Sequence, residues 1–286
     1  MPSMYAHHKM GLQVKALLGK PERQIIEKYP QLFLIGLHGP DILFYYKPLS
    51  SNPVNRTGYG MHDKPGSYFF ARAAKVIKSR PDKEACLSYV YGFICHFALD
   101  VTCHGYIDEK IKKSGVSHTE IEAEFDRELM TRDGLNPIRQ KLAGHIAATP
   151  ENAAVIQAFF PKITARQTLK ALKGTIFYNN LLVAPSPLKR GLIYAVLKLS
   201  GNYEKIHGLV LPYKRNEKCA DSTRRLTILY DEAKKLAVKL IGEYGDFLSG
   251  ERKLSPVYEK TFDSKLPMPK EKTGEKISAH DQRRAQ

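Results

Sequence analysis

One segment of this sequence, residues 89–104, combines a long apolar run with three polar side chains at four-residue spacing. His96, Asp100 and His104 follow one another at this spacing among aliphatic and aromatic neighbours. On an α-helix, such residues stay within roughly 80° of one another around the axis. Polar groups on an otherwise apolar helix are costly to bury without strong partners. The segment therefore predicts a buried helix with a polar stripe that binds a divalent cation such as Zn²⁺.

A second helix is predicted soon after the first. The Ser117–Glu120 stretch is a capping-box pattern, which predicts a helix from there to about residue 131. His118 and Glu122 then lie one turn apart near its N-terminus. Either motif alone is more often a hydrogen-bonded pair than a pair of ligands, whereas the two together favour a metal site.

Helical periodicity extends over most of the chain, and the alternation typical of strands is scarce. Residues 33–66 are an exception, because glycines and prolines divide them and predict a long, mostly irregular stretch. The sequence thus predicts an all-α fold, a multi-helix bundle. Its helices are expected over residues 9–18, 21–29, 67–80, 84–104, 118–131, 137–147, 151–159, 164–180, 187–199 and 222–249.

The chain is expected to have three parts. Residues 1–135 form a metal-binding helical core, and residues 136–249 form a helical continuation packed on that core. Residues 250–286 form a basic tail that is rich in lysine, proline and serine and poor in apolar residues. This composition predicts disorder.

Cysteine content and hydropathy predict a cytoplasmic protein. Four cysteines in 286 residues do not suggest a disulfide framework. Cys95 and Cys103 point about 100° away from the neighbouring histidines on a helix, so they are interpreted as small buried hydrophobes. No apolar run reaches the roughly 20 residues that span a bilayer, and the N-terminus lacks the apolar core of a secretory signal.

The net charge of +16 is unevenly distributed. Residues 151–200 carry seven basic residues and the single acidic residue Glu151. Such a region suits phosphate-bearing partners, either lipid head groups or nucleic acid, or it forms a solvated face. Within residues 164–199, apolar residues at helical spacing make this segment the candidate for peripheral membrane contact; a core-facing helix is the commoner use of such a pattern. The apolar residues concerned are Leu169, Leu172, Ile176, Leu181 and Leu182.

Further polar residues occur before these helices. Asp41 follows Gly39-Pro40 at a turn, and His62 follows Gly60-Met61. The motifs that carry a resemblance are, in order, Ala6-His7, Leu37–Ile42, Gly60–His62, Tyr91–Asp100, His104 and His118–Glu122. This ordered set covers about residues 5–130 and resembles the zinc-dependent phospholipase C family. That family shares an all-helical fold with single-strand nucleases and holds a cluster of three zinc ions.

The resemblance implies a set of ligands for each ion. One zinc ion takes Asp41, His62, His96 and Asp100; a second takes His104, His118 and Glu122; a third takes His7 and shares Asp100. Asp41 is also implied as the base that orients the attacking, metal-bound water. The secreted enzymes complete the third site with a processed N-terminal tryptophan, and this chain contains no tryptophan. Two zinc ions are therefore expected and the third stays open, with His8 as the alternative ligand to His7.

The expected function is that of a zinc-dependent phosphodiesterase of the phospholipase C type, acting on a phosphate ester. A phospholipid head group is the leading substrate class. One alternative is a nuclease-like hydrolase, in which aromatic residues such as Phe44 and Tyr59 stack on single-stranded bases. The other is a non-enzymatic helical protein with structural metals. Histidine and carboxylate ligands also suit iron or manganese.

Overall fold

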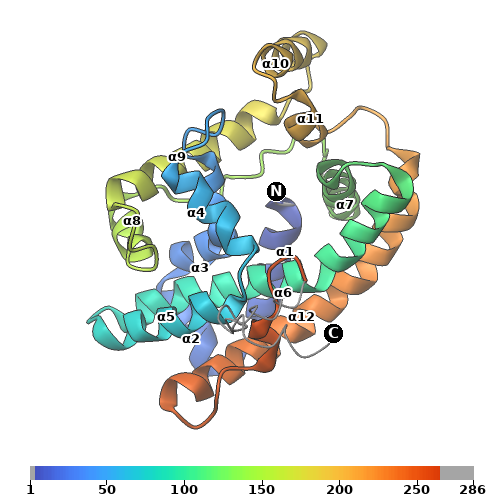
Figure 1. The fold of residues 1–286 in the computed structure, drawn as a ribbon. Coiled ribbons are helices and arrows are strands. Elements are labelled where there is room, and N and C mark those ends of the chain that lie inside the picture. The colour runs from blue at the N-terminus through green and yellow to red at the C-terminus, as the bar shows by residue number, and fades with distance from the viewer. Residues whose placement is uncertain (1–3, 265–286) are drawn as a thin grey trace, which may run out of the picture.

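The computed structural model describes residues 4–264, and the regular elements in this range are all helices. Figure 1 shows them arranged around the long helix α6. Pro65 and Thr261 form an isolated antiparallel bridge, but the described residues contain no strand. The all-α prediction is confirmed.

The elements of the first half are α1 (Met4–Leu17), α2 (Lys20–Lys28), α3 (Pro30–Gly36), the 3₁₀ helix η1 (Gly39–Tyr45), α4 (Pro53–His62), α5 (Gly66–Ser79), α6 (Lys83–Ser114) and α7 (His118–Arg132). Those of the second half are α8 (Pro150–Gln157), α9 (Ala165–Leu182), α10 (Pro187–Leu199), α11 (Tyr203–Ile206), the 3₁₀ helices η2 (His207–Leu209) and η3 (Glu217–Cys219), α12 (Ala220–Ser249) and the 3₁₀ helix η4 (Pro256–Glu259).

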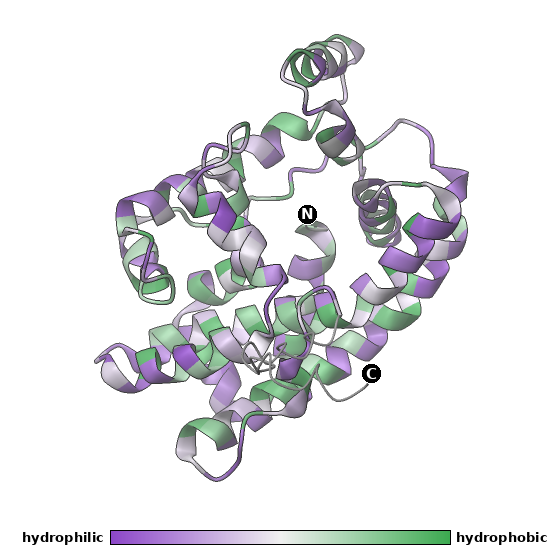
Figure 2. Cartoon of the chain, in the orientation of Figure 1, coloured by the Kyte–Doolittle hydropathy of each residue, from purple (hydrophilic) through white to green (hydrophobic). Residues whose placement is uncertain are grey.

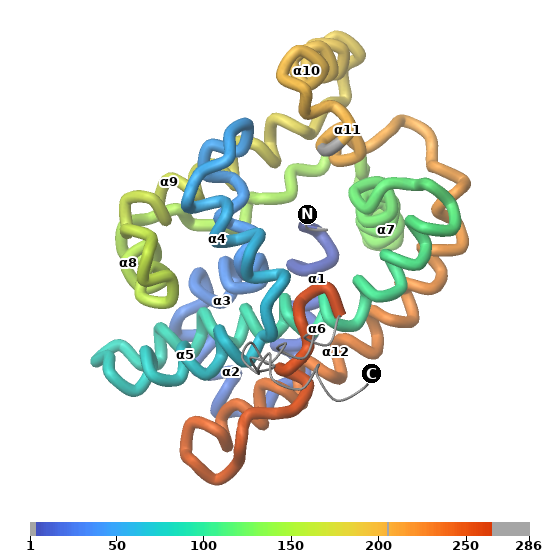
Figure 3. Tube along the Cα trace, viewed as in Figure 1, coloured from blue at the N-terminus to red at the C-terminus, as the bar shows by residue number. Residues whose placement is uncertain are grey.

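Helix α6 forms the centre of the core. Every residue from Ser88 to Val101 is buried, and α3 and α12 pack against the helix. The tube in Figure 3 shows α12 running beside it. The length and composition of α6 would suit a membrane span, but 89% of its most apolar window is buried inside the protein. It is therefore a core helix, and it continues past its expected end at residue 104 to Ser114.

Two glycines let α3 and α6 approach each other closely. A Cβ atom on Gly92 would lie 2.2 Å from the carbonyl oxygen of Phe33, and one on Gly36 would lie 2.2 Å from that of Tyr89. Any side chain at either position would push the two helices apart. Because α3 leads directly into η1, this contact also determines where η1 lies relative to α6.

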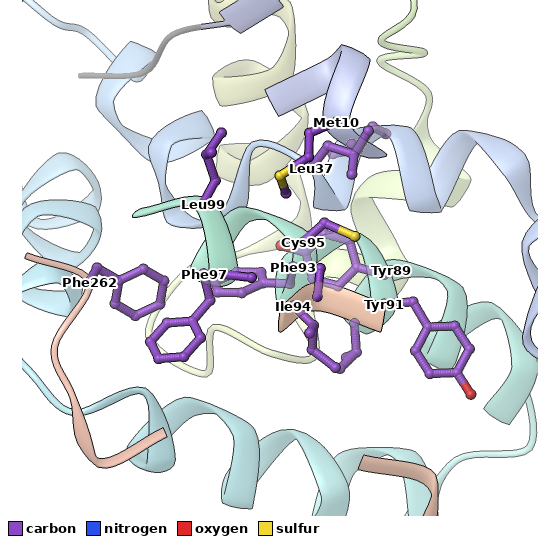
Figure 4. Packing of buried hydrophobic residues seen from close by; sticks show 14 of the residues in the cluster. Met10, Leu37, Tyr89, Tyr91, Phe93, Ile94, Cys95, Phe97, Leu99 and Phe262 are labelled. Carbon is purple, nitrogen blue, oxygen red and sulfur yellow. The ribbon is translucent and has the colours of Figure 1, made fainter. Parts of the chain in front are cut away.

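The hydrophobic core is continuous between the first and second halves of the chain. A single cluster of buried side chains extends from Met4 to Phe262. In Figure 4, Met10 and Leu37 lie on one side of α6, and Phe262 lies near Phe97; the ring centroids of these two phenylalanines are 5.0 Å apart. The expected boundary at residue 135 does not interrupt this cluster and stays a prediction.

The expectation that residues 33–66 are mostly irregular was wrong. Pro40 and Pro53 lie in the first turns of η1 and α4, where a helix does not need the missing N–H group. The side chain of Asn52 caps α4 by accepting hydrogen bonds from the first-turn backbone. These prolines therefore start helices rather than exclude them.

Two further expectations were wrong. No helix spans residues 137–147, because only Ala143 and Ile146 are buried there, too few to stabilise an isolated turn. The expectation of a disordered tail was wrong for residues 250–264, since Tyr258 and Phe262 are buried in the core. The rest of that tail, residues 265–286, lies outside the described residues.

Candidate metal centre

The polar stripe of α6 lies at the middle of the fold. His96, Asp100 and His104 are one turn apart on the same helix and at most 7% exposed. Neighbouring elements bring the other predicted ligands to this stripe. The contributing elements are α1 for His7, η1 for Asp41, α4 for His62, and α7 for His118 and Glu122.

Asp100 lies between four imidazoles. Its Oδ1 atom is 3.3 Å from His7 Nε2 and 3.6 Å from His104 Nε2. Its Oδ2 atom is 3.1 Å from His96 Nε2 and 3.9 Å from His62 Nε2. The two oxygens of one carboxylate thus face two different pairs of histidines, which is the geometry of a bridging group.

The first group of facing atoms is formed by Asp41, His62 and His96, all within 4.8 Å of one another. Asp41 Oδ1 is 3.1 Å from His62 Nε2, and Asp41 Oδ2 is 3.9 Å from His96 Nε2. His62 Nδ1 lies 3.1 Å from the carbonyl oxygen of Gly58, which can only accept. The Nδ1 atom is therefore the donor, and in the neutral ring Nε2 presents its lone pair to the carboxylates.

The second group is formed by His104, His118 and Glu122. Glu122 Oε1 is 3.1 Å from His118 Nε2 and 3.6 Å from His104 Nε2. The predicted capping box is present: Ser117 accepts from the backbone N–H of Glu120, whose carboxylate accepts in return from the Ser117 N–H. This cap fixes the first turn of α7, so the His118 and Glu122 side chains face α6.

The third group joins His7 to His96 and Asp100. The rings of His7 and His96 are stacked with their centroids 4.4 Å apart. His8, the alternative ligand, is in none of the three groups. Its ring stacks on that of His145 at 3.8 Å instead.

Several facing atoms have no hydrogen-bond partner within the part of the chain that the structure describes. They are Asp41 Oδ1, His96 Nε2, Asp100 Oδ2, His118 Nε2 and Glu122 Oε2. His96 Nε2 and Asp100 Oδ2 are close, yet they are not aligned for a hydrogen bond. Buried nitrogen and carboxylate atoms that face a common space fit the ligand chemistry of zinc.

A model of the zinc-dependent phospholipase C family matches residues 6–173, more than half of the chain, and this range includes all eight predicted ligands. The chain belongs to the zinc-dependent phospholipase C family. Searches of curated proteins and of solved structures gave no match. Membership confirms the resemblance drawn from the sequence motifs and supports a zinc-dependent hydrolase. The roles of the individual residues stay predictions.

The carboxylates of this family member are held in their charged form. Burial would raise the pKa of Asp100, but the nearby His96 and His104 outweigh it and hold that pKa well below its usual range. Burial would also raise the pKa of Asp41, but His96 and His62 outweigh it and lower that pKa below its usual range. The pKa of Glu122 is also lowered, because His118 outweighs its burial. All three groups are anionic at neutral pH.

The pKa values of two histidines shift in the opposite direction, upward. Burial lowers the pKa of His104, but Asp100 and the neighbouring Asp263 and Glu122 raise it well above its ordinary value. The pKa of His62 is also raised, since Asp41 and Asp100 outweigh burial. Zinc requires the neutral imidazole, so metal binding at this centre must release protons.

The metal-free protein is expected to be most stable at intermediate pH. The lowered pKa values of Asp41 and Asp100 stabilise the folded state above their ordinary value of 3.8, and this stabilisation is lost as the pH falls through the lowered values. The raised pKa values of His62 and His104 stabilise it below 6.5, and this contribution is lost as the pH rises through the raised values.

Zinc is expected to remove the alkaline loss, because the ion replaces the protons between these groups. Thermal unfolding from about pH 2 to pH 10, with chelator and with zinc, measures the acidic loss, the alkaline loss and the effect of zinc on the latter. An alkaline loss of the same size in both samples would contradict proton displacement at the centre.

The C-terminal segment after α12 contacts the centre, and the sequence analysis missed it. The ring of Phe262 lies 5.4 Å from that of His62 and 6.0 Å from that of His96. Ser264 Oγ donates to the carbonyl oxygen of Val101 at 2.7 Å and accepts from the N–H of Gly105 at 3.2 Å. These contacts hold the segment across the turns of α6 that carry the polar stripe.

Asp263 is the polar residue that this segment adds. Its Oδ1 atom is 3.5 Å from His104 Nδ1, the ring nitrogen that does not face Asp100. A carboxylate on the outer nitrogen is how proteins commonly orient a metal-binding histidine. Asp263 lies beyond the family match, so no family motif could have indicated it.

Other residues near the centre have separate partners. His38 Nε2 lies 2.6 Å from His145 Nε2, so these two rings share a hydrogen bond. Cys95 and Cys103 are buried, and burial raises their pKa values above the usual thiol range. Their interpretation as small buried hydrophobes is confirmed.

Proposed function

We propose that this protein is a zinc-dependent phosphodiesterase of the phospholipase C type, with a phospholipid head group as its substrate class. Asp100 carries the proposal, because its two oxygens face two different pairs of histidines. Two ions that share a carboxylate activate water and stabilise charge on phosphoryl oxygens. Family membership supports the same chemistry.

The proposed ligands are those expected from the motifs. Asp41, His62 and His96 would hold one ion with Asp100, and His104, His118 and Glu122 would hold the second. His7 would complete a third site with Asp100 and His96. Asp263 would orient His104 from outside the cluster.

The charge of the centre explains why cations are needed. Asp41, Asp100 and Glu122 are buried and anionic, so their fields would repel a phosphate group that approached them alone. Asp41 is also the proposed base: its lowered pKa keeps it deprotonated, and it would accept the proton of the attacking water.

One observation favours a second candidate, a nuclease-like hydrolase. The rings of Phe44 and Tyr59 are stacked 4.2 Å apart, and Phe44 lies 5.4 Å from the ring of His62. Tyr59 is exposed. An exposed aromatic ring beside the centre would stack on a base of single-stranded nucleic acid.

Metal analysis combined with two substrate assays tests the proposal. We expect at least two zinc ions per chain, one for each complete ligand set. Protein never exposed to chelator should hydrolyse phosphatidylcholine, lose this activity on chelation and regain it with zinc. Less than one metal equivalent would rule out the centre. Cleavage of single-stranded DNA without lipid hydrolysis would favour the second candidate, and bound zinc with neither activity would favour structural metals.

A further inference from the structure

Helix α10 extends away from the body of the protein. Figures 1 and 3 show it at the edge of the fold, beyond the end of α9. Its inner side packs on a small cluster that is separate from the main core. The buried members of that cluster are Ala184, Ile193, Leu197 and Val210.

The outer side of α10 is also apolar. Leu188, Leu192 and Val196 follow one another at four-residue spacing, and they are 84%, 66% and 48% exposed. Leu199 at the end of the helix is 90% exposed. Figure 2 shows hydrophobic residues on the turns of this helix. We call the surface formed by these four residues the α10 face. A helix with apolar residues on both sides is normally covered on both.

The neighbouring helix α9, in contrast, packs several of its apolar residues against the main core. Leu172 is buried, and Leu169 and Ile176 pack against the main core. The core-facing interpretation of this part of the sequence is therefore confirmed for these three residues. The last turns of α9 differ, because Phe177 and Leu181 are exposed.

Positive charge accompanies the α10 face. Residues 152–203 contain no aspartate or glutamate. Lys189 Nζ donates to the carbonyl oxygen of Val183 at 2.6 Å, and Arg190 donates to that of Leu211 at 2.8 Å. Carbonyl groups carry no net charge, so these hydrogen bonds leave both cations uncompensated. Lys198 adds a third positive charge on the same helix.

One cavity is lined both by the connection between α9 and α10 and by a proposed zinc ligand. It has a volume of about 70 Å³, and Glu122 forms part of its wall. Leu182 and Ala184, from the connection between α9 and α10, line it together with Leu209 and Leu211, which follow α11. The segments that hold α10 therefore also border a space beside a proposed zinc ligand.

We infer that the α10 face binds the surface of a phospholipid bilayer that contains anionic lipid. The exposed leucines enter the boundary between head groups and acyl chains, the exposed Lys198 contacts lipid phosphates, and the charges of Lys189 and the buried Arg190 attract the anionic surface. Docking would bring the connection between α9 and α10, which shares a cavity wall with Glu122, close to the lipid surface. The inference rests on the proposed function, since the bilayer then supplies the substrate.

A second copy of the chain fits this face poorly. A two-fold dimer would place the same surface on both sides of the interface, and the basic residues of one copy would face those of the other. An anionic bilayer complements the charge instead. The lipid surface is therefore the occupant that the charge favours.

Vesicle sedimentation with the zinc-loaded full chain tests this inference. Wild-type protein should bind vesicles of phosphatidylcholine mixed with phosphatidylserine, and bind pure phosphatidylcholine vesicles less tightly. The double variant Leu188→Ser/Leu192→Ser should bind at least about tenfold more weakly, because each leucine loses its transfer into lipid. Both side chains are exposed, so the variant should melt at the wild-type temperature.

Ile228→Ser is the matched control, because Ile228 on α12 is also half-exposed and lies outside the α10 face. It should bind vesicles like the wild type. All three proteins should hydrolyse a short-chain phosphatidylcholine equally when the lipid is dissolved as monomers. A wild type that binds no vesicles, a double variant that binds normally, or a wild-type dimer that the double substitution dissociates would each overturn the inference. Vesicle binding without any lipid hydrolysis would instead overturn the proposed function, while the inferred binding of the α10 face to lipid would stand.

Discussion

Replacement of Asp100 by asparagine is expected to lower zinc affinity by more than about a hundredfold, since even residues that merely support a ligand contribute 10–100-fold. The amide has nearly the same shape but no charge, and one of its two ends carries N–H groups toward a pair of imidazoles. Either orientation therefore opposes metal binding on one side of the bridge. Zinc per chain after dialysis, together with phosphatidylcholine hydrolysis, measures the effect, and both should fall.

Two control variants distinguish a bridging ligand from residues that only lie near the centre. Asp263→Asn changes a carboxylate that contacts His104 from outside the cluster. It should keep the zinc stoichiometry while weakening affinity by about 10–100-fold. His145→Ala should leave zinc unchanged, because that ring packs against His8 and His38 and is in none of the ligand groups. Wild-type stoichiometry and affinity in Asp100→Asn would contradict a bridging role.

Helices with strong local signals could be predicted from the sequence. Helix α7 begins where the Ser117 capping box indicates, because that cap uses only neighbouring residues. The element η1 could not be predicted, since all seven of its residues are buried by contacts with α4 and α9. Its glycine and its proline looked like loop residues because tertiary packing, and not local preference, stabilises this turn.

The residues of the candidate centre also divide into those that the sequence could predict and those that it could not. Four-residue spacing predicted that His96, Asp100 and His104 share a face, and α6 places them so. Asp263 could not be found in this way, because its contact with His104 joins distant parts of the chain. The signal that was available was Phe262, a large apolar residue inside a segment assigned to a disordered tail.

The second large effect is expected from Gly39→Ala. Gly39 begins η1 with φ of +48°, and an alanine Cβ there would lie 2.2 Å from His96 Cδ2. The left-handed backbone costs about 1–2 kcal/mol for a residue with a side chain. Displacement of the His96 ring adds a similar overpacking cost, so the free energy of unfolding should fall by about 2–5 kcal/mol in total. Zinc affinity should fall too, because His96 is a proposed ligand.

Gly134→Ala separates the two contributions. Gly134 also has a left-handed backbone, with φ of +72°, but a Cβ there meets nothing within 4 Å. It should lose only the backbone part, about 1–2 kcal/mol, and keep its zinc. Urea unfolding of both variants, with chelator and with zinc, gives the difference that belongs to the His96 contact. In zinc, the gap between the two variants should widen, since only Gly39→Ala disturbs a ligand of the ion that stabilises the folded state. Equal losses of stability and equal zinc affinities would show that His96 moves aside without cost and does not hold the metal.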